Sequence, residues 1–437
     1  MVNRLSSIVP CLHEQAIPPC LLLQALLLTA FFPIHTDHIR PSIDKEKPSM
    51  TMMHRRHFIG LGGLAAIAGA IGPAVAFQGK QETPGTASRI IRFDTDGLGL
   101  TPQEYSSLLN AVATDKGITA DYYSLGGAVE EMEQKFAALL GKEGAVFMPT
   151  GTLANQIGLR KLAGENRRVL VQAESHIYND CGDCAESLSG LNLIPLAPGQ
   201  ATFGVDEVDR WVQRSSGGRV ETNVGVISIE TPVRRKHHEM FDFDEMKKIS
   251  AYARERGIKL HLDGARLFNV PHHSGKTITE YTSLFDTVYV SLWKCFNAAS
   301  GAVLAGSKSF TEGLFHLRRM FGGGLPQAWP FASVAMRYAD DYLEGYSRAW
   351  NVADEFLSAL QKSDRIKIER VANGTSAFHM AVDGIAPPTF AERLLKKNIT
   401  LPQPQKGTGV FWMTVNTTLN RIRAGELAGT FLEASRL

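Results

Sequence analysis

Apolar and polar residues alternate along the chain in two recurring patterns. Val129, Met132 and Phe136 recur at the spacing of an α-helix, and the apolar run 145–148 that follows is typical of a buried strand. The succession continues with apolar runs at 169–171, 193–196, 224–229, 258–262, 287–291 and 302–304, with helical stretches such as 242–256 between most of them. Strands that alternate with helices predict a mostly parallel sheet of about seven strands, covered by helices on both faces.

The pattern changes in the last quarter of the chain. A long helical region is expected from about 327 to 360, then strands at 366–371, 377–382 and 409–415 with helices around 389–397 and 425–434. This mixture predicts a smaller α+β domain. We therefore expect a large domain over 77–335, with its N-terminal segment, and a small C-terminal domain over 336–437.

Residues 1–76 form an N-terminal extension of a different character. The pair Arg55-Arg56 precedes the uncharged stretch 58–77, which ends in the small-x-small pattern Ala74-Val75-Ala76. This segment resembles a twin-arginine (Tat) export signal, and it predicts a bacterial protein that the Tat translocase delivers to the periplasm or beyond. The alternative is an uncleaved anchor, because about 20 residues suffice to span a bilayer. The cleavage pattern favours removal, so no lasting membrane span is expected.

Composition narrows the class of protein. The 437 residues include 46 basic and 44 acidic ones, which gives a formal net charge of +2. Such a balance lacks the basic excess of a nucleic-acid-binding chain, so no nucleic acid partner is expected. Five cysteines are too few for a disulfide scaffold. The bulk of the chain is expected to be a globular domain with a sizeable core.

Candidate chemistry lies where apolar strands end, which is where parallel sheets bind ligands. Thr150, Gly151 and Thr152 stand between a strand and a helix, and either hold a phosphate or cap the helix. Asp263 ends a strand and either meets a cation or caps the next helix. Lys294 follows another strand and is either a buried nucleophile or a lysine that extends to solvent.

Together these three sites match the needs of pyridoxal 5'-phosphate. A phosphate site anchors the cofactor, a lysine forms a Schiff base with its aldehyde, and a carboxylate pairs with the protonated ring nitrogen. Along the chain the candidate phosphate site comes first, then Asp263 and then Lys294.

The sequences of these motifs resemble those of the low-specificity L-threonine aldolases, in the β-eliminating lyase group of fold-type-I pyridoxal-phosphate enzymes. The resemblance covers roughly residues 91–434. It is carried by Thr150-Gly151-Thr152 with Asn155-Gln156, Ser175-His176-Ile177, residues 261–269 and the Gly322-Gly323-Gly324 turn. The resemblance implies a large domain and a smaller C-terminal domain, and a homodimer or homotetramer.

The resemblance also implies roles for single residues. His176 corresponds to the family's imidazole, which stacks on the cofactor ring and takes part in proton transfer. Arg266 corresponds to the arginine that binds the substrate carboxylate, a task that suits its planar fork. Thr95 and Asp96 fall where the family has a Ser-Asp pair near that carboxylate, and Tyr123 falls at a tyrosine that lines the site from either subunit.

The implied reaction cleaves the Cα–Cβ bond of a β-hydroxy-L-amino acid, threonine-like or aryl-substituted, into glycine and an aldehyde. Two alternatives stay open at this point. One is a β-eliminating lyase that acts on another amino acid. The other is a non-catalytic relative that binds the cofactor or an amino acid.

The chain departs from the family's pattern at several positions. Pro326 stands where the family has an arginine after the triple glycine, and Phe411 or Trp412 falls at a second carboxylate-binding arginine. The family's Asn-rich loop is replaced by residues 231–238. The arginines that are available to compensate are Arg234 and Arg235 in that loop and Arg421 and Arg423 near the C-terminus.

The spacing of the cysteines and histidines does not indicate a further catalytic or metal site. Cys181 and Cys184 form a CxxC pair in a predicted helix beside His176, and two buried thiols is our interpretation. A disulfide, a redox pair or half a metal site are the alternatives. The pairs His237-His238 and 272–273 lack metal-ligand spacing, so we interpret them as surface loop residues and expect no metal site.

Overall fold

A computed structural model describes residues 90–436 of the chain. The predicted export signal and the N-terminal extension 1–76 lie outside these residues. The described residues, 90–436, belong to one compact unit by their internal contacts. Within residues 90–436, no helix is long and apolar enough to cross a membrane.

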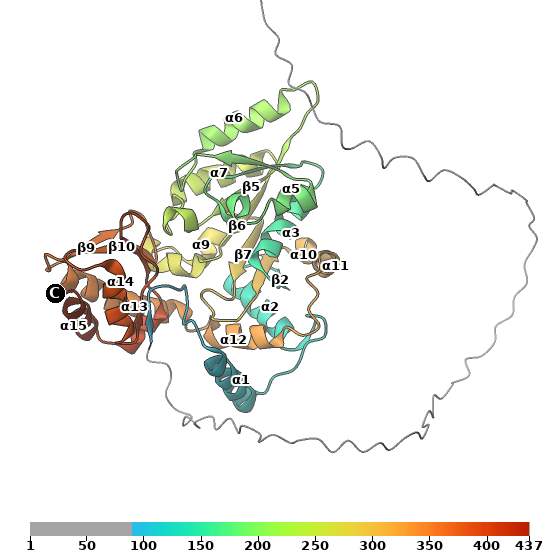
Figure 1. The fold of residues 1–437 in the computed structure, drawn as a ribbon. Helices are drawn as coiled ribbons and strands as arrows, with labels where there is room; N and C mark the ends of the chain where they lie inside the picture. Colours follow the sequence, from blue (N-terminus) through green and yellow to red (C-terminus); the bar gives the residue numbers. More distant parts are fainter. Residues whose placement is uncertain (1–89, 437) are drawn as a thin grey trace, which may run out of the picture. The chain divides into compact units, whose positions relative to one another are not determined.

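The central feature is a seven-stranded sheet (Figure 1). Its spatial order is β2 (Gly144–Met148), β8 (Ala302–Gly306), β7 (Thr287–Ser291), β6 (Lys259–Asp263), β5 (Val224–Glu230), β3 (Arg168–Gln172) and β4 (Asn192–Leu196). β7, β6, β5, β3 and β4 pair in parallel, while β8 runs antiparallel to both of its neighbours. The predicted α/β class is therefore confirmed, including the strand count.

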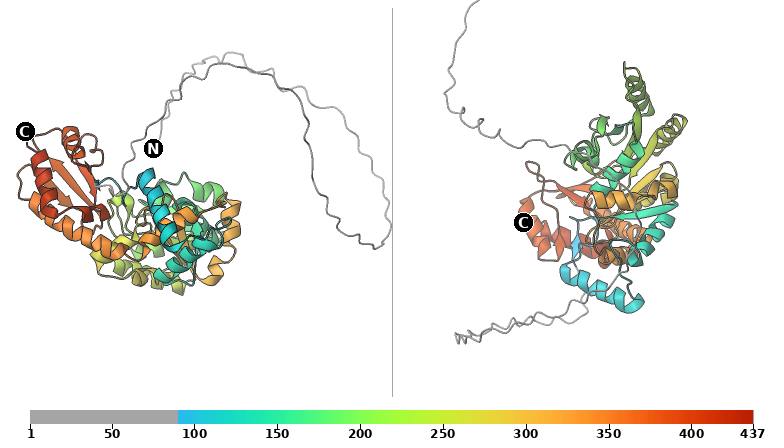
Figure 2. Two further views of the ribbon diagram at one scale, coloured as in Figure 1. Left: turned by 90° about the horizontal axis from the view of Figure 1, so that it is seen from below. Right: turned by 90° about the vertical axis from the view of Figure 1, so that its right-hand side faces the viewer.

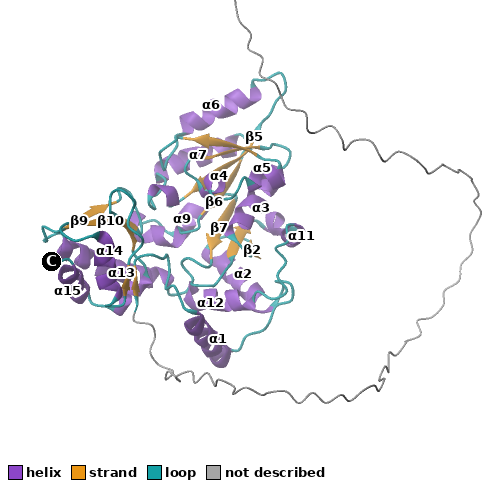
Figure 3. Ribbon diagram, viewed as in Figure 1, coloured by secondary structure: helices purple, strands orange, loops and turns teal. Residues whose placement is uncertain are grey.

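Helices cover both faces of this sheet, as Figure 3 shows in purple against the orange strands. Val288 and Val290 of β7 share a buried cluster with residues of α2 (Gly127–Leu139) and α7 (Phe243–Glu255). Tyr289 points to the opposite face, into a cluster with α3 (Gly151–Ala163). Alternate residues of one strand thus enter two apolar layers, which explains why the strands read as continuous apolar runs.

The remaining helices connect these strands or extend the layers. They are α1 (Pro102–Lys116), α4 (His176–Asn179), α5 (Cys184–Ser189), α6 (Val205–Ser216), α8 (Val270–Ser274), α9 (Ile278–Thr282), α10 (Lys308–Thr311) and α11 (Leu314–Met320). α1 begins with a capping box, in which Thr101 and Glu104 bond reciprocally to each other's backbone N–H.

A second, three-stranded antiparallel sheet lies beside the central one (Figure 2). Its order is β12 (Phe411–Thr414), β10 (Ala377–Val382) and β9 (Ile366–Arg370). α13 (Tyr342–Leu360), α14 (Pro387–Leu395) and α15 (Ala424–Ala434) contribute to the same apolar core. The short strands β1 (Ile91–Arg92) and β11 (Ile399–Thr400) pair in parallel and tie the start of the described chain to this region.

The helical region predicted over 327–360 consists of two helices. α12 (Trp329–Ala339) ends before Asp340, and α13 starts at Tyr342. α12 packs against α1 and α2, whereas α13 packs against α15 and β9, so the two helices have different packing partners. The apolar spacing continues through the break, which is why periodicity did not reveal it. The predicted domain boundary at 335/336 falls inside α12, and it stays a prediction.

A buried arginine organises the loop that precedes α2. Arg318 has no exposed surface, and its guanidinium donates to the carbonyls of Phe147, Tyr123 and Ser124 at 2.7, 3.3 and 3.2 Å. Tyr123 and Ser124 have positive φ angles of 52° and 59°, which L residues adopt at a cost. Arg318 therefore stabilises a turn that the local sequence disfavours.

We expect Arg318→Met to lower the free energy of unfolding by about 3 kcal/mol, because three buried carbonyls lose their donor. Arg319→Met is the matched control, since Arg319 is exposed and only covers the ring of Tyr123. That change is expected to cost less than about 1 kcal/mol. Urea unfolding of both variants measures the difference, and equal losses would contradict this account of the loop.

Candidate active site

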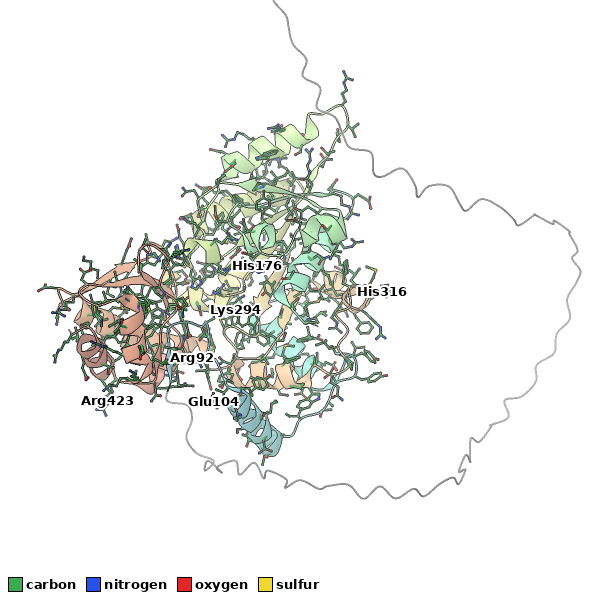
Figure 4. All side chains as sticks on the ribbon, viewed as in Figure 1. Arg92, Glu104, His176, Lys294, His316 and Arg423 are labelled. Carbon is green, nitrogen blue, oxygen red and sulfur yellow. The ribbon has the colours of Figure 1, made fainter. Side chains whose placement is uncertain are left out.

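The predicted functional residues meet at one edge of the central sheet. Glu230 and Asp263 end the parallel strands β5 and β6, and Lys294 follows the end of β7 by three residues. β2 runs in the same direction as β7, because both are antiparallel to β8, so Thr150 reaches this edge too. Figure 4 shows His176 and Lys294 in the same region of the molecule.

Asp263 is held by a chain of buried hydrogen bonds. The side-chain amide of Asn155 donates to Oδ2 of Asp263 at 2.6 Å. Oδ1 of Asn155 lies 2.9 Å from Nε2 of His261, whose Nδ1 lies 2.8 Å from Oγ1 of Thr287. Since Oδ1 only accepts, Nε2 of His261 carries the proton and Nδ1 accepts from Thr287.

His261 stays neutral in this chain of bonds. Burial lowers the pKa of His261 to about 4, which matches an imidazole that donates at one nitrogen and accepts at the other. The backbone N–H of Ala265 donates to Oδ1 of Asp263 at 3.1 Å. Each carboxylate oxygen thus has a fixed donor, and the orientation of Asp263 is set.

Lys294 is a buried amine. Its side chain lies against the ring of Trp293, and only 9% of the residue is exposed. Burial lowers the pKa of Lys294, and the nearby charge of Arg266 lowers it further. The structure therefore favours the nucleophile over the lysine that extends to solvent.

Arg266 and Asp96 form a bidentate ion pair. Nε and Nη2 of Arg266 lie 2.7 and 2.8 Å from the two carboxylate oxygens of Asp96, and both side chains are about nine-tenths buried. Burial would raise the pKa of Asp96, but Arg266 outweighs it and holds the pKa at about 2. Nη1 makes no hydrogen bond within residues 90–436, so it is available to a ligand.

His176 is fixed at two points. Its backbone N–H donates to Oε2 of Glu230 at 2.6 Å, and its ring Nδ1 lies 3.2 Å from Sγ of Cys181. The hydrogen bond to Cys181 raises the pKa of His176, against the effect of burial. His176 also lies within electrostatic range of Asp263 and Lys294.

Thr150, Gly151 and Thr152 form the start of α3. Oγ1 of Thr150 accepts from the N–H of Leu153 at 3.2 Å, so this residue caps the helix. A Cβ on Gly151 would lie 1.9 Å from the hydroxyl of Tyr289, which only glycine avoids. Capping leaves the amides of the first turn for an anion, because a helix start has more N–H groups than one side chain satisfies.

The two remaining predicted substrate residues lie in different places. Thr95 donates to the carbonyl of Gly97 at 2.8 Å and lines a pocket of about 500 Å³. Asp96 and Trp293 line the same pocket, so it adjoins Lys294. Tyr123 instead bonds through its N–H to the carbonyl of Pro326 at 2.9 Å, and no described contact joins it to Lys294.

The altered loop 231–238 is anchored by its own arginines. Arg234 and Arg235 both pair with Asp180, the residue that follows α4. They therefore do not face Arg266 as replacements for a lost arginine. Arg421 donates to the carbonyl of Ile90, and Figure 4 places Arg423 at the border of the small-sheet region, well apart from Lys294.

The interpretation of His238 as a surface residue is wrong. The side chain is buried, and Nδ1 lies 2.7 Å from Oγ of Ser376, which follows a turn of the small-sheet region. Burial, together with the charge of Arg266, lowers the pKa of His238 to about 3. His237 stands with its ring 4.0 Å from that of Trp412, centre to centre. The run 231–238 is polar, so the sequence does not indicate that His238 is buried. Ser376, which contacts its ring, directly precedes β10 of the second sheet.

The CxxC pair differs from its predicted form. Cys181 lies in a turn between α4 and α5 and is only half-buried, while Cys184 is buried at the first turn of α5. Both thiols are free. Among residues 90–436, no group of three or more His, Cys, Asp or Glu side chains is arranged to hold a metal ion.

Glu230 is a residue at this site that the sequence analysis did not single out. It pairs in register with Asp263 on the neighbouring strand, and it accepts from the N–H groups of His176 and Arg234 at 2.6 and 2.9 Å. Burial and the negative charge of Asp263 raise the pKa of Glu230 to about 7. The signal was available, because an acidic residue ends the apolar run 224–229.

Glu230→Gln should change how stability depends on pH. Because the folded chain holds this proton more tightly than the unfolded chain, the wild type loses stability as the pH rises from about 5 to about 8. We expect the variant to lose roughly 1–3 kcal/mol less over this range. Urea unfolding at both pH values measures it, with the exposed Glu221→Gln as control. Parallel pH profiles for all three proteins would refute a protonated Glu230.

Comparisons with known proteins agree with this geometry. A low-specificity L-threonine aldolase of Candida albicans is 29% identical over 302 residues, which is 68% of this chain and 78% of the relative. The crystal structure of a putative aromatic amino acid β-eliminating lyase/threonine aldolase from an Exiguobacterium species is 25% identical, with a TM-score of 0.65 over 80% of this chain and 98% of that one.

A second solved structure is similar to the same extent. A putative L-allo-threonine aldolase of Listeria monocytogenes is 28% identical, with a TM-score of 0.64 over 79% of this chain and 95% of that one. The family model described as β-eliminating lyase matches residues 111–382, which include Asp263, Lys294 and the start of α3. On this match and this geometry, the chain belongs to the β-eliminating lyase family.

Proposed function

We propose that this protein is a pyridoxal-phosphate-dependent lyase that cleaves a β-hydroxy-L-amino acid into glycine and an aldehyde. The observation that carries the proposal is the meeting of a buried amine, Lys294, with a fixed carboxylate, Asp263, beside the start of α3 at one sheet edge. The names of the similar proteins, low-specificity L-threonine aldolase and L-allo-threonine aldolase, support the same reaction.

The described residues fit the parts of this cofactor. The first amides of α3 would hold the phosphate, Asp263 would pair with the ring nitrogen, and Lys294 would bond to the aldehyde carbon. When bound, pyridoxal phosphate supplies an aldehyde that captures amines and a ring that accepts the electrons of the broken bond. A lysine with a lowered pKa is suited to this bond, because the uncharged amine is the nucleophile.

The substrate is oriented by residues of this chain. Nη1 of Arg266 is free to bind the carboxylate, while Asp96 fixes the plane of the guanidinium. Thr95 lies beside Asp96 in the pocket that adjoins Lys294. His176 would accept the proton of the β-hydroxyl group at Nε2, in the tautomer whose Nδ1–H donates to Sγ of Cys181. Orientation of the reacting bond is a large part of such catalysis.

Lys294→Ala tests the cofactor assignment without a substrate. The full chain is mixed with pyridoxal phosphate and reduced with borohydride, and its peptides are mapped by mass spectrometry. We expect a phosphopyridoxyl group on Lys294 in the wild type and no Lys294-dependent visible absorbance in the variant. Lys308→Ala is a matched control, because Lys308 is an exposed lysine on α10. Labelling spread over surface lysines would argue against the assignment.

Arg266→Lys tests substrate orientation. Lysine keeps the charge beside Asp96 but loses the fork, so we expect kcat/KM for L-threonine to fall roughly tenfold to a hundredfold. The assay measures glycine and acetaldehyde from L-threonine, and glycine and benzaldehyde from L-phenylserine. Release of a 2-oxo acid and ammonia would instead identify a β-eliminating lyase. A Lys294 adduct with no turnover of any amino acid would identify a relative that only binds.

We also propose that the chain is exported through the Tat route and assembles as a homodimer or homotetramer. The support for export is the sequence pattern of residues 54–77, which lie outside the described residues. The support for assembly is the resemblance to the family together with the exposed side chains Tyr122 and Leu125 on the loop that Arg318 holds.

A further inference from the structure

A thiol lies directly against the histidine of the site. Sγ of Cys181 is 3.2 Å from Nδ1 of His176 and 3.7 Å from Oγ1 of Thr152. Cys181 therefore links the imidazole to the first turn of α3. Cys181 has no role in the reaction proposed above.

The backbone is shaped to bring this thiol to the imidazole. Gly182 and Asp183 both have positive φ angles, 59° and 51°, so the chain turns back immediately after Cys181. An L residue such as Asp183 adopts this conformation at a cost, which the surrounding contacts must offset. On the other side, Asp180 is held by two ion pairs, with Arg234 and Arg235. Cys181 is thus fixed from both directions.

The thiol is an uncharged partner for the imidazole. The hydrogen bond with Cys184, and then burial, raise the pKa of Cys181 well above its ordinary value, so it stays protonated. Because the thiol keeps its own proton, which its hydrogen bond with Cys184 takes up, Sγ of Cys181 accepts from the Nδ1–H of the neutral His176 ring. Nε2 is then the nitrogen that is free to exchange a proton, and the ring cannot rotate without breaking this bond.

We propose that Cys181 is a positioning residue, which fixes the ring of His176 by its hydrogen bond to Nδ1 and so presents Nε2 to the substrate. The proposal rests on the proposed function for the part that His176 takes in the reaction. The contact itself does not depend on that function. Cys181 contacts His176 directly, and its effect on the reaction passes through His176.

Three substitutions separate the hydrogen bond from packing. Cys181→Ser keeps a group that bonds to Nδ1, whereas Cys181→Val keeps the volume and removes the bond. Cys181→Ala is the second bond-free variant, in case the branched side chain disturbs the turn. Cys184→Ser is the matched control, because it changes the neighbouring thiol and leaves the contact between Cys181 and His176 in place.

The first measurement needs no cofactor. The full chain is labelled with ring-¹⁵N histidine, and the His176 signals are identified as those missing from His176→Asn. We expect the Nδ1 signal to move in Cys181→Val and Cys181→Ala, and to stay close to the wild-type position in Cys181→Ser and Cys184→Ser. An unmoved Nδ1 signal in both bond-free variants would overturn the proposal.

The second measurement is a comparison of kcat with KM for L-threonine in the loaded enzyme. A misdirected imidazole affects the reaction rather than binding, so kcat should fall roughly tenfold to a hundredfold in the bond-free variants while KM changes less than about threefold. Cys181→Ser should recover most of kcat. A uniform rise in KM, or no rescue by serine, would overturn the positioning role.

The two proposals fail in different ways. If borohydride gives no adduct on Lys294, the proposed function fails, while the Nδ1 signal still reports on the contact. If the adduct forms and the bond-free variants keep the wild-type kcat, the function stands and the role of Cys181 is refuted.

Discussion

The site depends on the balance of charges buried at one sheet edge. Asp263, Glu230 and Asp96 bring three carboxyl groups there, Arg266 brings a guanidinium and Lys294 brings an amine whose pKa is lowered. Such charges are costly to bury unless they compensate one another. The raised pKa of Glu230 and the lowered pKa of Lys294 both reduce the number of charges that are buried together. Neutral His238 and neutral His261 add no further charge.

Some parts of the site could be predicted from the sequence, and others could not. Asp263 and Lys294 end or follow apolar runs, and the parallel alternation alone brings such residues to one edge. His238 could not be found in this way, because the residues that bury it come from the second sheet, more than a hundred positions further along. The contact between Cys181 and His176 depends on a turn with two positive φ angles, which the periodicity of a helix does not report.

The fold was predictable from local patterns along the chain. Every predicted strand matches an observed one within two residues, since each is a short apolar run between polar turns. The expected helical region 327–360 is present, and it divides into α12 and α13, which face different neighbours while keeping one apolar spacing. A change of packing partner leaves no mark on periodicity. Asp121 does mark the start of α12, by accepting from the N–H groups of Ala328 and Trp329.

Hydrogen bonds and an ion pair join the loop 231–238 to the segment that carries His176. Glu230 accepts from the N–H of His176 and from that of Arg234, and Arg234 in turn pairs with Asp180 just beyond α4. A segment that carries the imidazole and a segment that replaces the family's loop are thereby joined at both ends. Cys181 lies within the first of these segments, directly after Asp180. The loop after Glu230 and the thiol at Nδ1 therefore fix the same short helix, each from its own side.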